Sequence, residues 1–321
     1  MMLQNIMGTP LLSWLASSLI AGGVGRFFLV CHERFKREAR ACFPDDVEFS
    51  CPSVEATSDQ LHVFLSTADE SEEDIIVVTG PAVILPFAAD EEQFDSAPIV
   101  SPVTSVSKQA LMAALDEKFI FTAFLKDHGV PYTDRDGVYG VADLQEMTSW
   151  QPVLSRAKLY ELSKQGVEIW DYNTTYVDPA ASVGPGTVLL PGTILRGQTS
   201  IGKNCTIGPN SYLENARIGD GTKISHLTYV GDSDVGKNIN FGCGTVTVNY
   251  DRAKKYRTVI EDNAFIGCNT NLIAPVRVGE GAYIAAGSTI TDDIPAMALS
   301  IARARQQNKK DWASKHKLKE K

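Results

Sequence analysis

One histidine stands apart in the second half of the sequence. His226 is the only histidine between residues 175 and 295, and it lies in the segment GTKISHLTYVGD, residues 221–232. A histidine has an unperturbed pKa of ~6.5, so it can take up a proton at neutral pH. Acyl transfer to an amine needs such a base, because the attacking nitrogen must lose a proton as the tetrahedral intermediate forms. A surface or packing histidine is the competing interpretation.

A basic segment follows closely. Residues 249–257, NYDRAKKYR, carry Arg252, Lys254, Lys255 and Arg257 in a chain whose formal net charge is −9. Such a cluster in an acidic protein predicts a local anion-binding site. A solvated charge run is the alternative that the sequence leaves open.

A repeat of six residues must position these groups. Aliphatic residues recur every sixth position in two runs, at Val177, Val183, Leu189, Leu195, Ile201, Ile207 and Leu213, and at Ile260, Ile266, Leu272, Val278, Ile284 and Ile290. This period fits neither an amphipathic helix nor an alternating strand. Three such hexads complete one triangular coil with its aliphatic residues inside, which predicts a left-handed parallel β-helix.

Between the two runs the period shifts, and the basic segment interrupts it. Loops that leave a solenoid are a usual place for function. Because Ile224 and Val230 occupy inward positions, we expect His226 at a corner or on an outward face. A β-sandwich of short strands is the competing fold, but it would show a spacing of about 8–12 residues.

Composition limits the class of protein. The 321 residues are 44% hydrophobic and 21% charged, with a pI of about 5.1, which indicates a globular protein and argues against nucleic-acid binding. The six cysteines, Cys31, Cys42, Cys51, Cys205, Cys243 and Cys268, form no CxxC pair. We therefore expect a reduced cytoplasmic protein without a structural metal. No segment has the roughly 20 apolar residues of a membrane span.

The first half has the pattern of an α/β domain. Helices are predicted at Leu11–Ile20 and Leu111–Lys126, the second ending near Gly129, and strands at Phe27–Cys31 and Ile75–Val78. Residues 153–166 form a linking helix that ends at Gly166. The expected division is an α/β domain over 1–150, a linking helix and junction over 151–174, the β-helix over 175–295 and a tail over 296–321.

The segments HLTYVGD, NYD and SIARARQ, followed by Trp312, carry a family resemblance. The chain closely resembles the acetyltransferase half of the bifunctional N-acetylglucosamine-1-phosphate uridyltransferase / glucosamine-1-phosphate N-acetyltransferase family, nearly without gaps from Ile218 to Trp312. The upstream segment GVEIWDYNTTYVDP resembles the junction between that family's two domains.

This resemblance implies specific roles. It implies a homotrimer with sites between subunits, His226 as the catalytic base, and acetyl-CoA as cosubstrate. Tyr229 and Asn240 match residues that hold the amino-sugar phosphate, and Lys255 lies in the active-site loop with Asn249 and Tyr250. The implied acetyl-CoA contacts are Cys243, Asn249, Tyr250, Cys268, Ala286 and Arg303. Arg303 would suit a CoA phosphate. Cys268 as a nucleophile is an alternative, although direct transfer needs no acyl-enzyme.

Two positions depart from the family pattern. Arg196 precedes His226 by the spacing of the family's phosphate-binding arginine, although the surrounding coil looks like an earlier one and whole coils are missing. Glu214 stands where the family has a phosphate-binding lysine. Exchanging a cation for an anion beside a phosphate is repulsive.

The first half resembles a shortened, degenerate nucleotidyltransferase domain. MLQNIMGTPLLSWL matches the family just after its nucleotide loop, and Pro81 stands where a strand end carries a magnesium-binding aspartate. We therefore expect no uridyltransferase activity and no magnesium.

The expected function is acetyl transfer from acetyl-CoA to an amino-sugar phosphate. Glucosamine-1-phosphate is the expected acceptor and N-acetylglucosamine-1-phosphate the product, in the supply of UDP-N-acetylglucosamine. A non-catalytic trimeric scaffold derived from the bifunctional enzyme is the alternative.

Overall fold

The structure is a computed structural model that describes residues 1–6, 8–53, 56–68, 74–85, 102–117, 119–132 and 137–315. The chain divides into two compact units, one of Met1–Pro185 with Ile194–Thr199 and the other of Gly186–Thr193 with Ser200–Lys321. The four-part division expected from the sequence stays a prediction, because compactness alone does not show which segment folds independently. No described helix has both the length and the apolar character that crossing a membrane requires.

The first unit is an α/β assembly of small sheets. Its helices are α1 (Leu11–Ala21), α2 (Lys36–Arg40), α3 (Thr57–Ser66), α4 (Lys108–Leu115), α5 (Phe121–His128), α6 (Leu144–Ser149) and α7 (Gln151–Lys164), with the 3-10 turn η1 (Glu33–Phe35). Its strands are β1 (Asn5–Ile6), β2 (Thr9–Pro10), β3 (Arg26–Phe28), β4 (Glu48–Ser50), β5 (Asp74–Val78), β6 (Ala82–Leu85), β7 (Val103–Ser107), β8 (Val130–Pro131), β9 (Gly137–Gly140), β10 (Glu168–Ile169), β11 (Tyr176–Val177), β12 (Ser182–Val183) and β14 (Ile194–Arg196).

Apolar side chains of α1 and of the buried strand β6 form the centre of this unit. Strand β6 pairs antiparallel with β9, and β5, β7 and β8 form a separate antiparallel sheet. Leu15 and Leu19 of α1 pack with Ala82 and Ile84 of β6. The helix predicted at Leu11–Ile20 and the strand predicted at Ile75–Val78 are thereby confirmed.

Two predicted elements of this unit are wrong in extent. The single helix expected at Leu111–Lys126 is two helices, α4 and α5, because Phe119 leaves the helical path and packs edge-on against Phe124, with ring centroids 5.4 Å apart. The strand expected at Phe27–Cys31 ends at Phe28, and Val30 is 56% exposed. The linking helix is α7, and Gly166 follows it with a φ of 89°.

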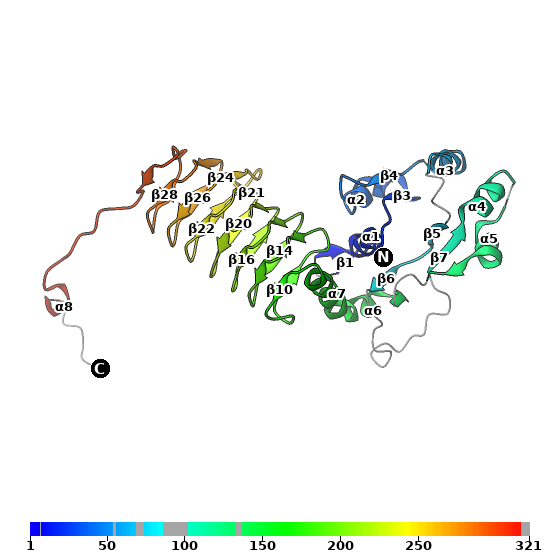
Figure 1. Ribbon diagram of the computed structural model, residues 1–321, viewed down its shortest axis with the longest axis horizontal. Coiled ribbons are helices and arrows are strands. Elements are labelled where there is room, and N and C mark those ends of the chain that lie inside the picture. The colour runs from blue at the N-terminus through cyan, green and yellow to red at the C-terminus, as the bar shows by residue number, and fades with distance from the viewer. Residues whose placement is uncertain are drawn as a thin grey trace. The chain divides into compact units, whose positions relative to one another are not determined.

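The second unit is a left-handed parallel β-helix. In Figure 1 its short strands stack as successive rungs. The strands are β13 (Val188–Leu189), β15 (Ser200–Ile201), β16 (Thr206–Ile207), β17 (Tyr212–Glu214), β18 (Arg217–Ile218), β19 (Lys223–Ile224), β20 (Tyr229–Gly231), β21 (Ser233–Val235), β22 (Asn240–Phe241), β23 (Val246–Val248), β24 (Thr258–Ile260), β25 (Phe265–Ile266), β26 (Asn271–Ile273), β27 (Val276–Val278), β28 (Tyr283–Ile284), β29 (Thr289–Ile290) and β30 (Leu299–Ser300).

Three parallel sheets form the faces of the prism. Within this unit their orders are β13-β16-β19-β22-β25-β28-β30, β15-β18-β21-β24-β27 and β17-β20-β23-β26-β29. We call these the first, second and third faces. After β30 on the first face the chain leaves as a tail that contains α8 (Trp312–Lys315).

The hexad residues form the interior column as predicted. All thirteen are at most 5% exposed. The period shifts because two coils each have one side that is a residue shorter. Ile201, Ile218 and Val235 nevertheless pair in register on the second face. The corners depend on left-handed backbone, which asparagine and glycine tolerate best. Asn238 and Asn263, for example, have φ values of 55° and 62°.

Candidate functional site

One edge of the prism carries the predicted base and three of the predicted acetyl-CoA contacts. Corner residues that follow β19, β22, β25 and β28 lie one above another, and we call this set the His226 edge: His226, Cys243, Cys268 and Ala286. The backbone links them, because Gly244 N donates to His226 O at 3.3 Å and Asn269 N to Cys243 O at 2.7 Å. Gly287 N likewise donates to Cys268 O at 2.8 Å.

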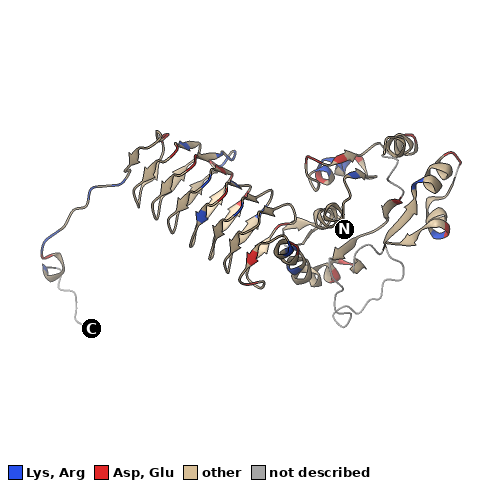
Figure 2. Ribbon diagram, in the orientation of Figure 1, with Lys and Arg blue, Asp and Glu red and all other residues tan. Residues whose placement is uncertain are grey.

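Arg303 lies at the end of the same edge. A Cβ atom built on Gly287 would be 3.6 Å from Cδ of Arg303, and Arg303 itself is exposed at the start of the tail. Basic residues continue along this tail (Figure 2). Cys243, Cys268 and Ala286 therefore form a row with Arg303 at one end, whereas the predicted acetyl-CoA contacts Asn249 and Tyr250 belong to the turn between β23 and β24.

The His226 corner has an unusual backbone. His226 and Leu227 follow one another with φ values of 53° and 49°, a conformation that costs a residue with a side chain about 1–2 kcal/mol. Hydrogen bonds hold the corner in place: Thr228 Oγ1 donates to Ser225 O and His226 O, both at 3.0 Å. Leu227 N donates to Pro209 O at 3.2 Å. The corner is thus fixed by its neighbours and leaves the His226 side chain exposed, as the hexad phase predicted.

The cysteines of the edge differ in access. Both are free thiols, Cys243 half-buried and Cys268 exposed. The backbone N–H of Cys243 makes no hydrogen bond within the described part of the chain. It is therefore a candidate donor to an oxyanion that forms beside His226.

A polar cluster lies on the third face, directly after the His226 corner. We call it the Tyr229 cluster: Tyr229, Glu214, Lys255, Asp232 and Asn249. Lys255 Nζ donates to Glu214 Oε1 at 3.0 Å and lies 3.7 Å from Asp232 Oδ2. Tyr229 Oη is 3.4 Å from Glu214 Oε2, and Asn249 Nδ2 lies 3.5 Å from Tyr229 Oη and bonds to Asp232 Oδ2.

The missing side chain at Gly231 makes this cluster possible. Glu214 and Gly231 pair in register on adjacent strands. A Cβ atom on Gly231 would be 2.4 Å from Tyr229 Oη and 2.7 Å from Asn249 Nδ2. The Tyr229 ring therefore passes over Gly231 to reach the carboxylate of Glu214.

Residues 249–257 form an ordered turn between β23 and β24. Asp251 Oδ1 accepts from Ala253 N and Lys254 N, both at 2.8 Å, and Tyr256 N donates to Asn249 O at 2.8 Å. Tyr250, 58% exposed, forms a bridge to Lys255. The turn thus directs Lys255 onto the third face and leaves Tyr250 outside.

Arg257 fastens the end of this turn. Its Nε and Nη2 each bond to a different oxygen of Asp234 at 2.8 Å, and its Nη1 donates to Asn215 O at 3.1 Å. The guanidinium holds the pKa of Asp234 below its usual range, and the carboxylate raises the pKa of Arg257. This paired geometry keeps residues 249–257 against the β-helix.

Asn240 and Arg196 lie elsewhere. Asn240 is exposed on the first face, in register with Lys223 and Phe265, so the His226 corner separates it from Tyr229 within one chain. Arg196 belongs to the first unit, where its Nε donates to Asp178 Oδ2 at 3.0 Å. Asp178 is 3% exposed, and its carboxylate also accepts hydrogen bonds from Thr9, Tyr176 and Gly197. We therefore leave Arg196 out of the proposed site.

Sequence inspection missed three positions of the candidate site. Gly231 lies two residues after Tyr229 in HLTYVGD, so the strand period could have placed it on the same face. Asp232 follows with a φ of 43°, between β20 and β21. Asp234 had no such signal, because its partner Arg257 is 23 residues away. Among the described residues, no group of three or more His, Cys, Asp or Glu side chains has the geometry of a metal site.

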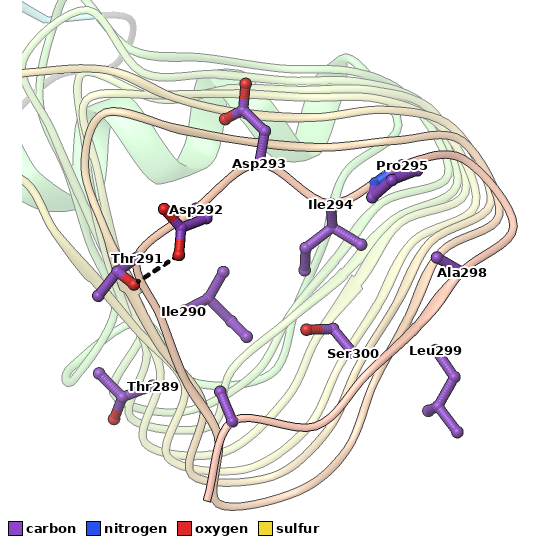
Figure 3. A pocket seen from close by; sticks show the side chains of 11 residues that line it. Thr289, Ile290, Thr291, Asp292, Asp293, Ile294, Pro295, Ala298, Leu299 and Ser300 are labelled. Carbon is purple, nitrogen blue, oxygen red and sulfur yellow. Dashed lines mark hydrogen bonds between the residues drawn. The ribbon is translucent and has the colours of Figure 1, made fainter.

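A hollow of about 210 Å³ lies at the last coil. Figure 3 shows Ile290 and Ile294 pointing into it, with Ser300 beside them. Ile290 and Ile294 are the last interior positions of the prism, and both remain buried. The hollow is therefore the open end of the β-helix and not an extension of the Tyr229 cluster.

Comparisons with known proteins agree with this architecture. The family model "Bacterial transferase hexapeptide (six repeats)" matches residues 180–215 and 257–292. The bifunctional protein GlmU of Caldicellulosiruptor saccharolyticus is 44% identical over 240 residues, which is 59% of this chain and 52% of that protein. The GlmU of Thermoanaerobacter pseudethanolicus is 36% identical over 294 residues, 70% of this chain and 64% of that one.

Among solved structures, a hexapeptide-repeat-containing acetyltransferase from Vibrio cholerae aligns with a TM-score of 0.30 and 22% identity. It covers 32% of this chain and 67% of that one. The chain spans between about half and two thirds of the length of the two GlmU proteins. The chain is thus similar to the bifunctional GlmU proteins, and within it residues 180–215 and 257–292 are similar to the hexapeptide repeats of bacterial transferases.

Proposed function

We propose that this chain is an acetyl-CoA-dependent N-acetyltransferase whose acceptor is an amino sugar. The observation that carries the proposal is that exposed His226 lies at one end of the row formed with Cys243, Cys268 and Ala286, immediately before the strand that carries Tyr229. The edge would hold acetyl-CoA, with Arg303 on a CoA phosphate, and the cluster would hold the sugar. The relatives' name and the hexapeptide repeats support the same class of enzyme.

The residues suit direct transfer. His226 would take the proton that the acceptor amine loses as its nitrogen attacks the acetyl carbonyl carbon. The Cys243 N–H would donate to the carbonyl oxygen as negative charge develops there. The C–S bond then breaks, the acetyl group stays on nitrogen, and CoA leaves as a thiolate that takes up a proton. No acyl-enzyme forms on Cys268.

The family resemblance implies glucosamine-1-phosphate as the acceptor, giving N-acetylglucosamine-1-phosphate for UDP-N-acetylglucosamine supply, and this compound is the reference against which other amino sugars are compared in the assay. Two finer statements belong to the proposal itself. The active assembly is a homotrimer, in which Asn240 of one subunit can face the Tyr229 cluster of another. The chain does not transfer uridylyl groups, because Pro81 replaces the aspartate that would bind magnesium.

The decisive test is thiol release from acetyl-CoA with the full chain and a panel of amino sugars. We expect His226→Ala to lower kcat by about 100-fold or more, since general bases contribute about 10²–10⁴-fold. The KM for acetyl-CoA and the oligomeric state should not change. His62→Ala, at a 43%-exposed histidine of the first unit, is the matched control and should retain full activity.

Two results would count against the proposal. Full turnover by the His226→Ala variant would exclude this residue as the base. Absence of turnover with every amino sugar, in a wild-type trimer that still binds acetyl-CoA, would favour the scaffold alternative.

A further inference from the structure

Lys255, the only cation of the Tyr229 cluster, already forms ion pairs within the cluster. Lys255 Nζ lies 3.0 Å from one carboxylate, Glu214, and 3.7 Å from a second, Asp232. Its hydrogen bond to Glu214 raises the pKa of Lys255, so the ammonium form persists. With two carboxylates and one ammonium, the cluster has a formal charge of −1.

Arg257 and Lys254 of the same turn form no hydrogen bond with Glu214 or Asp232 in the described part of the chain. Arg257, which ends the turn, places both of its terminal contacts on Asp234 and Asn215. Lys254 lies over the ring of Tyr256, with Nζ 4.6 Å from the centroid. The direct contacts of these two cations are therefore with other groups, and the nearby charge of Asp232 adds only a smaller contribution to the raised pKa of Arg257.

The remaining members of the cluster are neutral hydrogen-bonding groups. Burial, assisted by the negative charge of Glu214, raises the pKa of Tyr229, so its hydroxyl keeps its proton. Asn249 offers an amide beside it. A sugar hydroxyl can donate to Glu214 or Asp232 and accept from Tyr229 or Asn249. A doubly ionised phosphate has no proton to donate, and the carboxylates of Glu214 and Asp232 would repel it.

We infer that Glu214 determines acceptor specificity: the chain prefers an amino sugar that presents hydroxyl groups to the Tyr229 cluster over one that presents a phosphate. The inference rests on the proposed function and narrows its substrate class. Glu214 acts in two ways, by repelling the phosphate and by occupying the ammonium of Lys255 that would otherwise bind it.

The test compares glucosamine with glucosamine-1-phosphate as acceptors, at saturating acetyl-CoA and low ionic strength, for the full chain. We expect wild type to have the higher kcat/KM with glucosamine. Glu214→Lys should move the ratio of the two kcat/KM values toward the phosphate by about tenfold or more. Glu214→Gln, which keeps the shape and removes the charge, should move it in the same direction by less. Glu280→Lys makes the same charge reversal on an exposed residue of another corner and should leave the ratio unchanged.

A binding measurement separates this inference from the proposed function. Titration of glucosamine-1-phosphate into each variant, followed by calorimetry, should show at least about tenfold tighter binding by Glu214→Lys than by wild type. That result would support the inference even if no variant released thiol, an outcome that would overturn only the acetyltransferase proposal. Equal binding by the two proteins, or a wild-type preference for the phosphorylated sugar that Glu214→Lys does not increase, would overturn the inference.

Discussion

Gly231→Ala should disturb the acceptor site without breaking the β-helix. Gly231 is not among the residues with positive φ, so alanine suits its backbone. The new Cβ would lie 2.4 Å from Tyr229 Oη and 2.7 Å from Tyr229 Cζ, closer than real Cβ contacts allow. Because those atoms are the far end of a side chain, we expect the Tyr229 ring to move and the strand to stay.

The size of the effect follows from the contacts that Tyr229 would lose. Its hydroxyl lies 3.4 Å from Glu214 and 3.5 Å from Asn249. A net hydrogen bond contributes about 0.5–1.5 kcal/mol, and these long ones should lie at the low end. Their joint loss, about 1–2 kcal/mol, corresponds to an acceptor kcat/KM that is roughly tenfold lower. The free energy of unfolding should fall by only about 1 kcal/mol, at the low end for overpacking.

Steady-state thiol release and thermal unfolding together test this expectation. The KM for the amino sugar should rise while the KM for acetyl-CoA stays constant. Tyr229→Phe should give a similar loss, and the double variant should lose little more, because both changes remove the same interactions. Gly25→Ala, where a Cβ would meet nothing within 4 Å, is the matched glycine control. Unchanged acceptor kinetics in Gly231→Ala would refute the close approach of Tyr229 and the role given to it.

Three further predictions concern the loop, the first unit and the core. Arg257→Ala should lower the free energy of unfolding by at most about 1 kcal/mol, because its ion pair with Asp234 is partly exposed. It should nevertheless raise the KM for the acceptor and speed proteolytic cleavage within residues 249–257. Unchanged cleavage would mean that Arg257 does not hold the loop. Burial lowers the pKa of Lys158 to about 8 from 10.5. The folded chain thus binds this proton less tightly than the unfolded chain, so the free energy of unfolding in urea should rise by about 1–3 kcal/mol as the pH increases from the lower to the higher of these pKa values. This rise should vanish in Lys158→Met. An equal dependence of stability on pH in both proteins would contradict the lowered pKa of Lys158. Leu272→Ala, at a 0%-exposed interior position, should lower the free energy of unfolding by about 2–5 kcal/mol. Leu272→Met, which nearly conserves the volume, should lower it by less than about 1.5 kcal/mol. Equal losses in the two variants would show that the interior is not closely packed around Leu272.

The sequence alone determined the β-helix and the position of His226. A period of six residues has one packing solution that buries every repeated aliphatic side chain, so Val177 to Ile290 could be assigned to the interior without a structure. The same phase places Ile224 and Val230 inside and therefore His226 at a corner. In the first unit, local patterns found α1 and β5 but not the break between α4 and α5, because that break depends on where Phe119 packs.

Only the tertiary structure decided which charged groups meet. Glu214 and Lys255 are 41 residues apart, and coil winding together with the turn at 249–257 makes them an ion pair. Sequence reasoning identified Glu214 as an anion in place of a lysine and placed Lys255 in the active-site loop, but it did not predict that the two residues pair with each other. Arg196 likewise bonds to a buried carboxylate 18 positions away. Periodicity fixes the face on which a side chain lies, whereas its partner depends on the stacking of coils and on how far each side chain reaches.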